Sequence, residues 1–181
     1  MTNHFYFAYG SNMNPDRIRQ RIPGARLVGK AHIKGWKLAE RLYADIDRAR
    51  GERVEGVLYL VTPSELFRLD AYEGYPRTYN CIGVNAYLDN EHKVYAVTYV
   101  MTPETKKERD GKPYPRDYRL ICSAGAHFHG VKNLFTRKED PPFGFRIGGG
   151  YNWLTPPRKP KAKKDEWWPP IPNLGGETAK E

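Results

Sequence analysis

The sequence is poor in the residues that mark disulfide-rich, metal-binding and membrane-spanning proteins. It has two cysteines in 181 residues, Cys81 and Cys122, and their spacing matches no metal or redox motif. We expect both to be free thiols in a reducing cytoplasm. No apolar run is long enough to cross a bilayer, and the first residues lack the basic, apolar and small-residue regions of a signal peptide. A cytoplasmic protein with no membrane partner is therefore predicted.

The sequence also lacks the signatures of common nucleic-acid-binding modules, namely zinc-finger, helix-turn-helix and RNP motifs. The net charge of +9 would suit a polyanion, but part of it lies in one Pro- and Lys-rich segment, residues 158–164. That composition is typical of a solvated tail, so we do not expect a nucleic-acid partner. Three tryptophans near it could stack on single-stranded nucleic acid or dock the tail, and docking is the favoured interpretation: Trp153, Trp167 and Trp168.

The composition of the rest is that of one globular domain with a core of its own, because 39% of the residues are hydrophobic and 28% are charged. After residue 138 the chain becomes rich in Pro, Gly, Trp and Lys. We predict a folded domain over residues 1–138 and a C-terminal extension over residues 139–181.

Strands outnumber helices in the predicted order of elements. Alternating patterns predict strands near the N-terminus and over residues 25–38, 54–61, 79–88 and 93–101. Helices are predicted over residues 15–22, 63–73 and 116–125, and loops over 41–53 and 102–115. Because crossover helices are few, the predicted fold class is mixed α/β (α+β), with a small barrel-like sheet flanked by helices.

The most informative stretch lies a few residues from the start of the chain. Aromatic residues at positions 5, 6, 7 and 9 fit a half-buried strand. The strand breaks at Gly10, where the backbone can adopt a positive φ or approach a ligand closely. Asn14 and Pro15 then suit the N-cap and first turn of a helix. A strand that passes through a Gly-Ser-Asn turn into a helix presents backbone N–H groups, which can bind a carboxylate or an oxyanion.

Glu73, at the end of the predicted helix 63–73, is the candidate general base. It shares one face with Leu66, so this face points toward the core. Burial would raise the pKa of Glu73, and the partial negative charge at the helix C-terminus would raise it further, which suits a base near neutral pH. Two alternatives stay open from the residues alone. Glu73 is an exposed acid before a Gly74 cap, or Asp70, one turn earlier, is the functional carboxylate.

Taken together, these features resemble the γ-glutamylcyclotransferase family. The resemblance covers about residues 4–136 and rests on an ordered set of motifs rather than on any one of them. The motifs are Tyr6-Phe7-Ala8-Tyr9-Gly10-Ser11-Asn12-Met13, Val54-Glu55-Gly56-Val57-Leu58-Tyr59, Leu69-Asp70-Ala71-Tyr72-Glu73-Gly74, Tyr99-Val100-Met101-Thr102, and Pro115-Arg116-Asp117-Tyr118 with the run Leu120-Ile121-Cys122-Ser123-Ala124-Gly125-Ala126.

The resemblance implies both a fold and an activity. The family fold is a small mixed α/β domain with a barrel-like sheet, so residues 1–138 would form a catalytic domain. Members remove a γ-glutamyl group from an amine by cyclising it to 5-oxoproline, and they use no metal and no organic cofactor. The partner that this implies is a small-molecule γ-glutamyl substrate.

The resemblance also assigns roles by position. Glu73 matches the catalytic acid/base, and Tyr118 matches a tyrosine that lines the pocket. The substrate-binding loop corresponds to Tyr6, Phe7, Ala8, Tyr9, Gly10 and Ser11. Backbone N–H groups of the last three are the expected donors to an oxyanion, although the same amides or the Ser11 hydroxyl could instead hold the α-carboxylate of the substrate.

The sequence also has features that bear on two other functions. His127 and His129 would face the same way on a strand and could bind a metal, but no third ligand stands nearby in the sequence. The chain could also be a binding protein that holds an anionic ligand in the pocket, or nucleic acid through its tail, without turnover. Glu73 argues against this alternative, since a site that only binds an anion has little use for a carboxylate.

Overall fold

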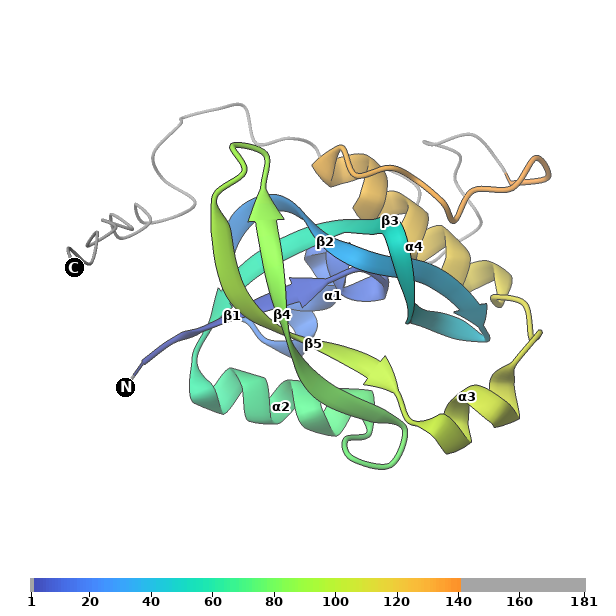
Figure 1. Cartoon of the computed structure of the whole chain (residues 1–181), viewed down its shortest axis with the longest axis horizontal. Coiled ribbons are helices and arrows are strands. Elements are labelled where there is room, and N and C mark those ends of the chain that lie inside the picture. The colour runs from blue at the N-terminus through green and yellow to red at the C-terminus, as the bar shows by residue number, and fades with distance from the viewer. Residues whose placement is uncertain (1, 141–181) are drawn as a thin grey trace.

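Five strands form a closed barrel in the order β1-β3-β2-β4-β5 (Figure 1). The computed structural model describes residues 2–140, so the extension beyond Asp140, with its tryptophans and basic segment, lies outside the described residues. The strands are β1 (His4–Ala8), β2 (Arg26–Arg41), β3 (Tyr43–Val61), β4 (Tyr79–Leu88) and β5 (Lys93–Met101). The helices are η1 (Ser11–Met13, a 3₁₀ turn), α1 (Pro15–Arg21), α2 (Pro63–Glu73), α3 (Pro103–Arg109) and α4 (Arg116–His129). The predicted mixed α/β class with a small barrel-like sheet is confirmed.

The short strand β1 closes the barrel. It pairs antiparallel with β3 and parallel with β5, whereas the β2–β3, β2–β4 and β4–β5 pairs are antiparallel. Alternate side chains of the strands fill the interior, where Phe7, Ile33 and Leu58 are fully buried. Outside the barrel, α4 packs on η1 and α1 packs on α2. The end of β1 and the turn η1 therefore lie where three helices meet the sheet.

Helix boundaries follow the capping signals in the sequence. The Asn14 side chain accepts hydrogen bonds from the backbone N–H groups of Asp16 and Arg17 and caps α1. Thr62 and Glu65 form a reciprocal capping box at the start of α2, and Gly74, in the left-handed conformation, ends that helix. The predicted helix 63–73 is confirmed to the residue.

The predicted loop over residues 41–53 is wrong. This segment belongs to a long hairpin in which β2 and β3 turn around Leu42, whose φ is 63°. Two-stranded ribbons with charged side chains show no apolar alternation, so the sequence pattern did not mark a strand. The ribbon is held by its backbone ladder and by the buried Ala44 and Ile46, and Arg41 adds ion pairs to Asp45 and Asp47.

Two helical predictions also need correction. The predicted loop over residues 102–115 contains α3, which begins with a Thr102 cap and Pro103, the same signal that begins α2. Helix α4 continues to His129, where Gly130 caps it in the left-handed conformation, instead of ending near Gly125. The stripe that predicted α4 ends at Gly125, but the helix continues through Ala126, which is fully buried, to His129.

Gly125 sets the distance between α4 and η1. A Cβ atom at this position would lie 2.5 Å from the backbone nitrogen of Asn14 and 2.6 Å from the carbonyl carbon of Met13. Alanine has the higher helix propensity, but backbone cannot yield as a flexible side chain does. We expect Gly125→Ala to lower the free energy of unfolding by about 1–2 kcal/mol, as measured in urea. An unchanged or higher value would contradict this close packing.

Candidate active site

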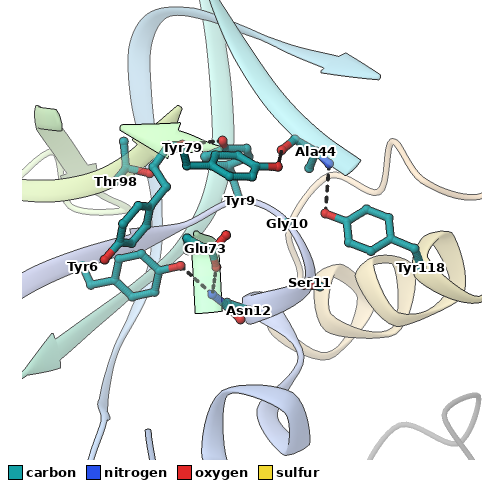
Figure 2. A pocket seen from close by; sticks show the side chains of 11 residues that line it. Tyr6, Tyr9, Gly10, Ser11, Asn12, Ala44, Glu73, Tyr79, Thr98 and Tyr118 are labelled. Carbon is teal, nitrogen blue, oxygen red and sulfur yellow. Dashed lines mark hydrogen bonds between the residues drawn. The ribbon is translucent and has the colours of Figure 1, made fainter. Parts of the chain in front are cut away.

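A small cavity of about 40 Å³ opens at the end of β1, where η1 begins (Figure 2). Segments far apart in the sequence line it: the β1–η1 turn, the tip of the β2–β3 hairpin, the end of α2, strands β4 and β5, and α4. The lining residues are Tyr6, Tyr9, Gly10, Ser11, Asn12, Ala44, Glu73, Tyr79, Thr98, Tyr99 and Tyr118.

Gly10 lets the hairpin tip and α4 come close to the turn. Its φ is −121°, so the left-handed conformation is not the reason for glycine here. A Cβ atom would instead lie 3.0 Å from the Tyr118 hydroxyl and 3.1 Å from the Ala44 Cβ. The structure thus shows no positive φ at Gly10, and the groups that come close to this glycine are Tyr118 and Ala44 of the protein itself.

Glu73 is the last residue of α2, and its side chain is only 17% exposed. The interpretation of Glu73 as an exposed acid before the glycine cap is therefore wrong. Its Oε1 atom accepts hydrogen bonds from Asn12 Nδ2 at 3.1 Å and from Arg21 Nη1 at 3.0 Å. The second carboxylate oxygen is turned toward the cavity (Figure 2). One oxygen thus holds the group in place while the other faces the space that a ligand would occupy.

The environment of Glu73 raises the pKa of its carboxyl group. Burial is the largest cause, because it penalises the charged form. The positive charge of Arg21 and the hydrogen bond from Asn12 oppose this effect without cancelling it. The result is a carboxylate that takes up a proton more readily than an exposed glutamate does.

The backbone N–H and C=O of Ala44 hold two of the tyrosines that line the cavity. Its N–H donates to the Tyr118 hydroxyl at 2.9 Å, and its carbonyl accepts from the Tyr79 hydroxyl at 2.9 Å (Figure 2). The Tyr9 hydroxyl donates to the carbonyl of Tyr99. Burial raises the pKa of Tyr9, Tyr79 and Tyr118 well above its usual value, so the phenols stay neutral.

Six of the eight residues that the sequence singled out line this one cavity, namely Tyr6, Tyr9, Gly10, Ser11, Glu73 and Tyr118. Phe7 and Ala8 do not. Phe7 lies fully buried in the barrel, and its carbonyl accepts a hydrogen bond from the Thr98 hydroxyl. Ala8 is buried in the ladder opposite Val57. A sequence motif names a contiguous run, but only part of this run reaches the cavity.

Sequence reasoning missed several residues of the site. Asn12 and Tyr99 lie inside the family motifs, but the sequence does not indicate a role for either of them. Arg21 carried no signal, because nothing in the spacing showed that α1 faces Glu73. Ala44 lay in the segment that was mistaken for a loop. Asp70, the competing carboxylate, accepts a hydrogen bond from the Tyr99 hydroxyl at 2.7 Å and is not among the lining residues.

The other candidate groups lie apart from the cavity or in an unreactive state. His127 and His129 are in the last turn of α4 and not on a strand, and residues 2–140 contain no group of three or more His, Cys, Asp or Glu placed to hold a metal ion. Both cysteines are free. Burial raises the pKa of Cys122 to about 12, so its thiol is protonated at neutral pH.

Comparisons with known proteins agree on one family. The family model described as "Gamma-glutamyl cyclotransferase, AIG2-like" matches residues 6–120. The chain is 28% identical to the gamma-glutamylcyclotransferase of Mus musculus over 146 residues, which are 74% of this chain and 75% of the mouse protein. It is 29% identical to the Homo sapiens gamma-glutamylcyclotransferase over 146 residues, with the same coverage, 74% and 75%.

The structures agree as well. The fold superposes on a solved gamma-glutamyl cyclotransferase with a TM-score of 0.62 at 26% identity, covering 72% of this chain and 82% of the other. No helix within residues 2–140 is long and apolar enough to span a membrane. With the family model matching more than half of its length, this chain belongs to the gamma-glutamyl cyclotransferase, AIG2-like family.

Proposed function

We propose that this protein is an enzyme that cleaves γ-glutamyl amides to 5-oxoproline and a free amine, with Glu73 as the general acid/base. The observation that supports this most is the Glu73 carboxylate itself. It has a raised pKa, one oxygen held by Asn12 and Arg21, and the other turned into a cavity lined by neutral phenols. A site that only bound an anion would gain nothing from this group.

The chemistry makes one bond and breaks one bond. The neutral α-amine of the γ-glutamyl unit attacks the γ-carbonyl carbon, and the carbonyl electron pair moves to oxygen. Glu73 takes the proton that the attacking nitrogen loses. As the carbonyl reforms, the bond to the departing nitrogen breaks, and protonated Glu73 returns the proton to that nitrogen. No water is consumed, and the reaction as written requires no metal and no organic cofactor.

Because the nucleophile is part of the substrate, the main task of the cavity is to fold the glutamyl chain for attack. Orientation of this kind can lower the activation free energy by several kcal/mol. In our proposal the backbone N–H groups of Tyr9, Gly10 and Ser11, with the Ser11 hydroxyl, hold the α-carboxylate. Tyr118, fixed by the Ala44 N–H, packs against the glutamyl chain. The γ-glutamyl unit occupies the cavity in this proposal, and the departing amine projects from it.

The experiment that tests this function is product analysis by mass spectrometry. The full-length protein would be incubated with γ-glutamyl amines, γ-glutamyl dipeptides and a γ-glutamyl unit on a larger metabolite. We expect 5-oxoproline and the free amine in equal amounts from at least one of these substrates, and the panel would identify the preferred amine. If no substrate gave 5-oxoproline, the proposal would fail and a non-catalytic binding role would replace it.

Gly10 provides a test of the fit around the substrate. In Gly10→Ala the new methyl group would press on the Tyr118 hydroxyl and the Ala44 Cβ, each of which must move by a few tenths of an ångström. We expect kcat/KM to fall roughly tenfold, because misplacement of positioning groups is costly even when it is small. Steady-state kinetics would measure this, with the melting temperature as a check that the fold is intact. Unchanged kinetics would mean that Gly10 does not set the geometry.

A further inference from the structure

The direction of one hydrogen bond in the cavity is fixed by chemistry. Arg21 Nη1 lies 2.9 Å from Asn12 Oδ1 and can only donate, so the oxygen of the Asn12 amide must face Arg21. The amide nitrogen must then face the other way, toward Glu73 at 3.1 Å and the Tyr6 hydroxyl at 2.8 Å. The Tyr6 oxygen is therefore an acceptor for Asn12, and its own hydrogen remains available.

Most other hydroxyls of the cavity have already donated their hydrogen to the protein. Tyr9 donates to the Tyr99 carbonyl, Tyr79 to the Ala44 carbonyl, and Tyr99 to Asp70. They can offer only lone pairs to a ligand. Within residues 2–140, no acceptor is found for the hydrogen of Tyr6, which is buried and lines the cavity. A buried donor that lacks a partner costs stability, and such a group is expected where a ligand completes the bond.

Tyr6 also stands beside the base. Its hydroxyl and Glu73 Oε1 accept from the same Asn12 nitrogen, and Figure 2 shows the two groups side by side at one end of the cavity. The Tyr118 hydroxyl lies on the other side, next to Ala44. An amine placed to lose its proton to Glu73 would thus have its target carbonyl within reach of Tyr6.

We propose that Tyr6 is a second catalytic residue, whose hydroxyl donates a hydrogen bond to the γ-carbonyl oxygen as that oxygen becomes an oxyanion. This rests on the proposed function, in which the loop amides hold the α-carboxylate, and it gives the oxyanion a side-chain donor. The Tyr6 proton is not transferred. The hydrogen bond stabilises the negative charge that develops on the carbonyl oxygen during attack, and it weakens again when the carbonyl re-forms. Burial and the charge of Glu73 raise the pKa of Tyr6 far above its usual value, so the phenol keeps its proton in this role.

The test compares Tyr6→Phe with Tyr59→Phe in the full-length protein. Tyr59 is the matched control, because its ring stacks on Tyr6 with centroids 6.4 Å apart and its buried hydroxyl has no partner in the described part of the chain. Tyr6→Phe is expected to lower kcat roughly 100-fold with little change in KM, the size seen when one oxyanion donor is lost. Tyr59→Phe should leave both constants close to the parental values.

The outcomes separate this proposal from the proposed function. If Tyr6→Phe kept the parental kcat while Glu73→Gln lost it, the function would stand and the role of Tyr6 would be wrong. If Tyr6→Phe raised KM and left kcat unchanged, Tyr6 would bind substrate without stabilising the transition state, and the proposal would again be overturned. If the parent protein produced no 5-oxoproline, both proposals would fail together.

Discussion

Glu73→Gln is expected to lower kcat by roughly 1000-fold, the middle of the range for loss of a general acid/base. Glutamine has nearly the same shape and can still accept the hydrogen bonds that Asn12 and Arg21 donate to Oε1. It cannot accept the proton of the attacking amine. The loss should therefore appear in kcat, with a small change in KM and no loss of fold. Single-turnover release of 5-oxoproline measures it directly.

Asp70→Asn is the matched control, because Asp70 lies one turn earlier on α2 and was the competing carboxylate. Its side chain accepts from the Tyr99 hydroxyl at 2.7 Å, a bond that asparagine can keep. We expect activity to stay within about tenfold of the parent, since the loss is limited to a charge-assisted hydrogen bond. If the Asp70 variant lost activity and the Glu73 variant did not, the assignment of the base would be reversed.

The raised pKa of Glu73 predicts the shape of the pH profile. The base must be ionised to act, so kcat/KM should fall as the pH drops through the Glu73 pKa. Because burial raises that pKa, the acidic limb should lie above the usual glutamate value of about 4.3. A profile that stayed flat down to that value would contradict a buried base.

The second large effect concerns stability and the hairpin tip. Asp45 is fully buried and binds the Met101 N–H at 2.9 Å, Arg41 at 2.7 Å and Lys106 at 3.3 Å. Asp45→Asn would put a neutral amide at this fully buried position, while Arg41 and Lys106 would keep their ion pairs with Asp47. Loss of one partner of a buried ion pair costs about 3 kcal/mol or more. We expect a melting temperature lower by roughly 10 °C for a domain of this size.

Asp110 offers a control within the same cluster. It contacts Arg41 at 3.3 Å, but its side chain is 76% exposed, so Asp110→Asn should change the free energy of unfolding by less than about 1 kcal/mol. Asp45 also follows Ala44, whose backbone N–H and C=O hold Tyr118 and Tyr79, so the Asp45 variant should lose activity below its melting temperature as well. Equal melting temperatures for the two variants would show that burial does not govern this cluster.

Local signals predicted the elements that carry them. Both ends of α2 are predicted by the Thr62–Glu65 capping box with Pro63 and by Gly74, because capping depends on residues that are neighbours in the sequence. Strands with apolar alternation were found for the same reason. The sequence does not predict the β2–β3 ribbon, because its charged residues mask the strand pattern. Its ion pairs, such as Arg41–Asp45, depend on a turn at Leu42 that no motif marks.

The site was predictable only where the family motif passed through it. Glu73 and the turn at Gly10 were named from the sequence, and the structure places both at one cavity. Arg21 and Ala44 could not be found in this way, because their importance arises from where α1 and the hairpin tip lie in space. Nor could the sequence show that the Tyr6 hydroxyl accepts from Asn12 and keeps its own hydrogen available. That conclusion follows from the hydrogen bonds that link Arg21, Asn12 and Tyr6.

The most direct test of intramolecular cyclisation is the fate of oxygen from water. The full-length protein would turn over a γ-glutamyl amide in water enriched in ¹⁸O, and mass spectrometry would identify the products. Attack by the α-amine predicts 5-oxoproline without ¹⁸O, released together with the free amine and lost in Glu73→Gln. Free glutamate carrying ¹⁸O in its γ-carboxyl group would mean that water is the nucleophile, and the account would be wrong.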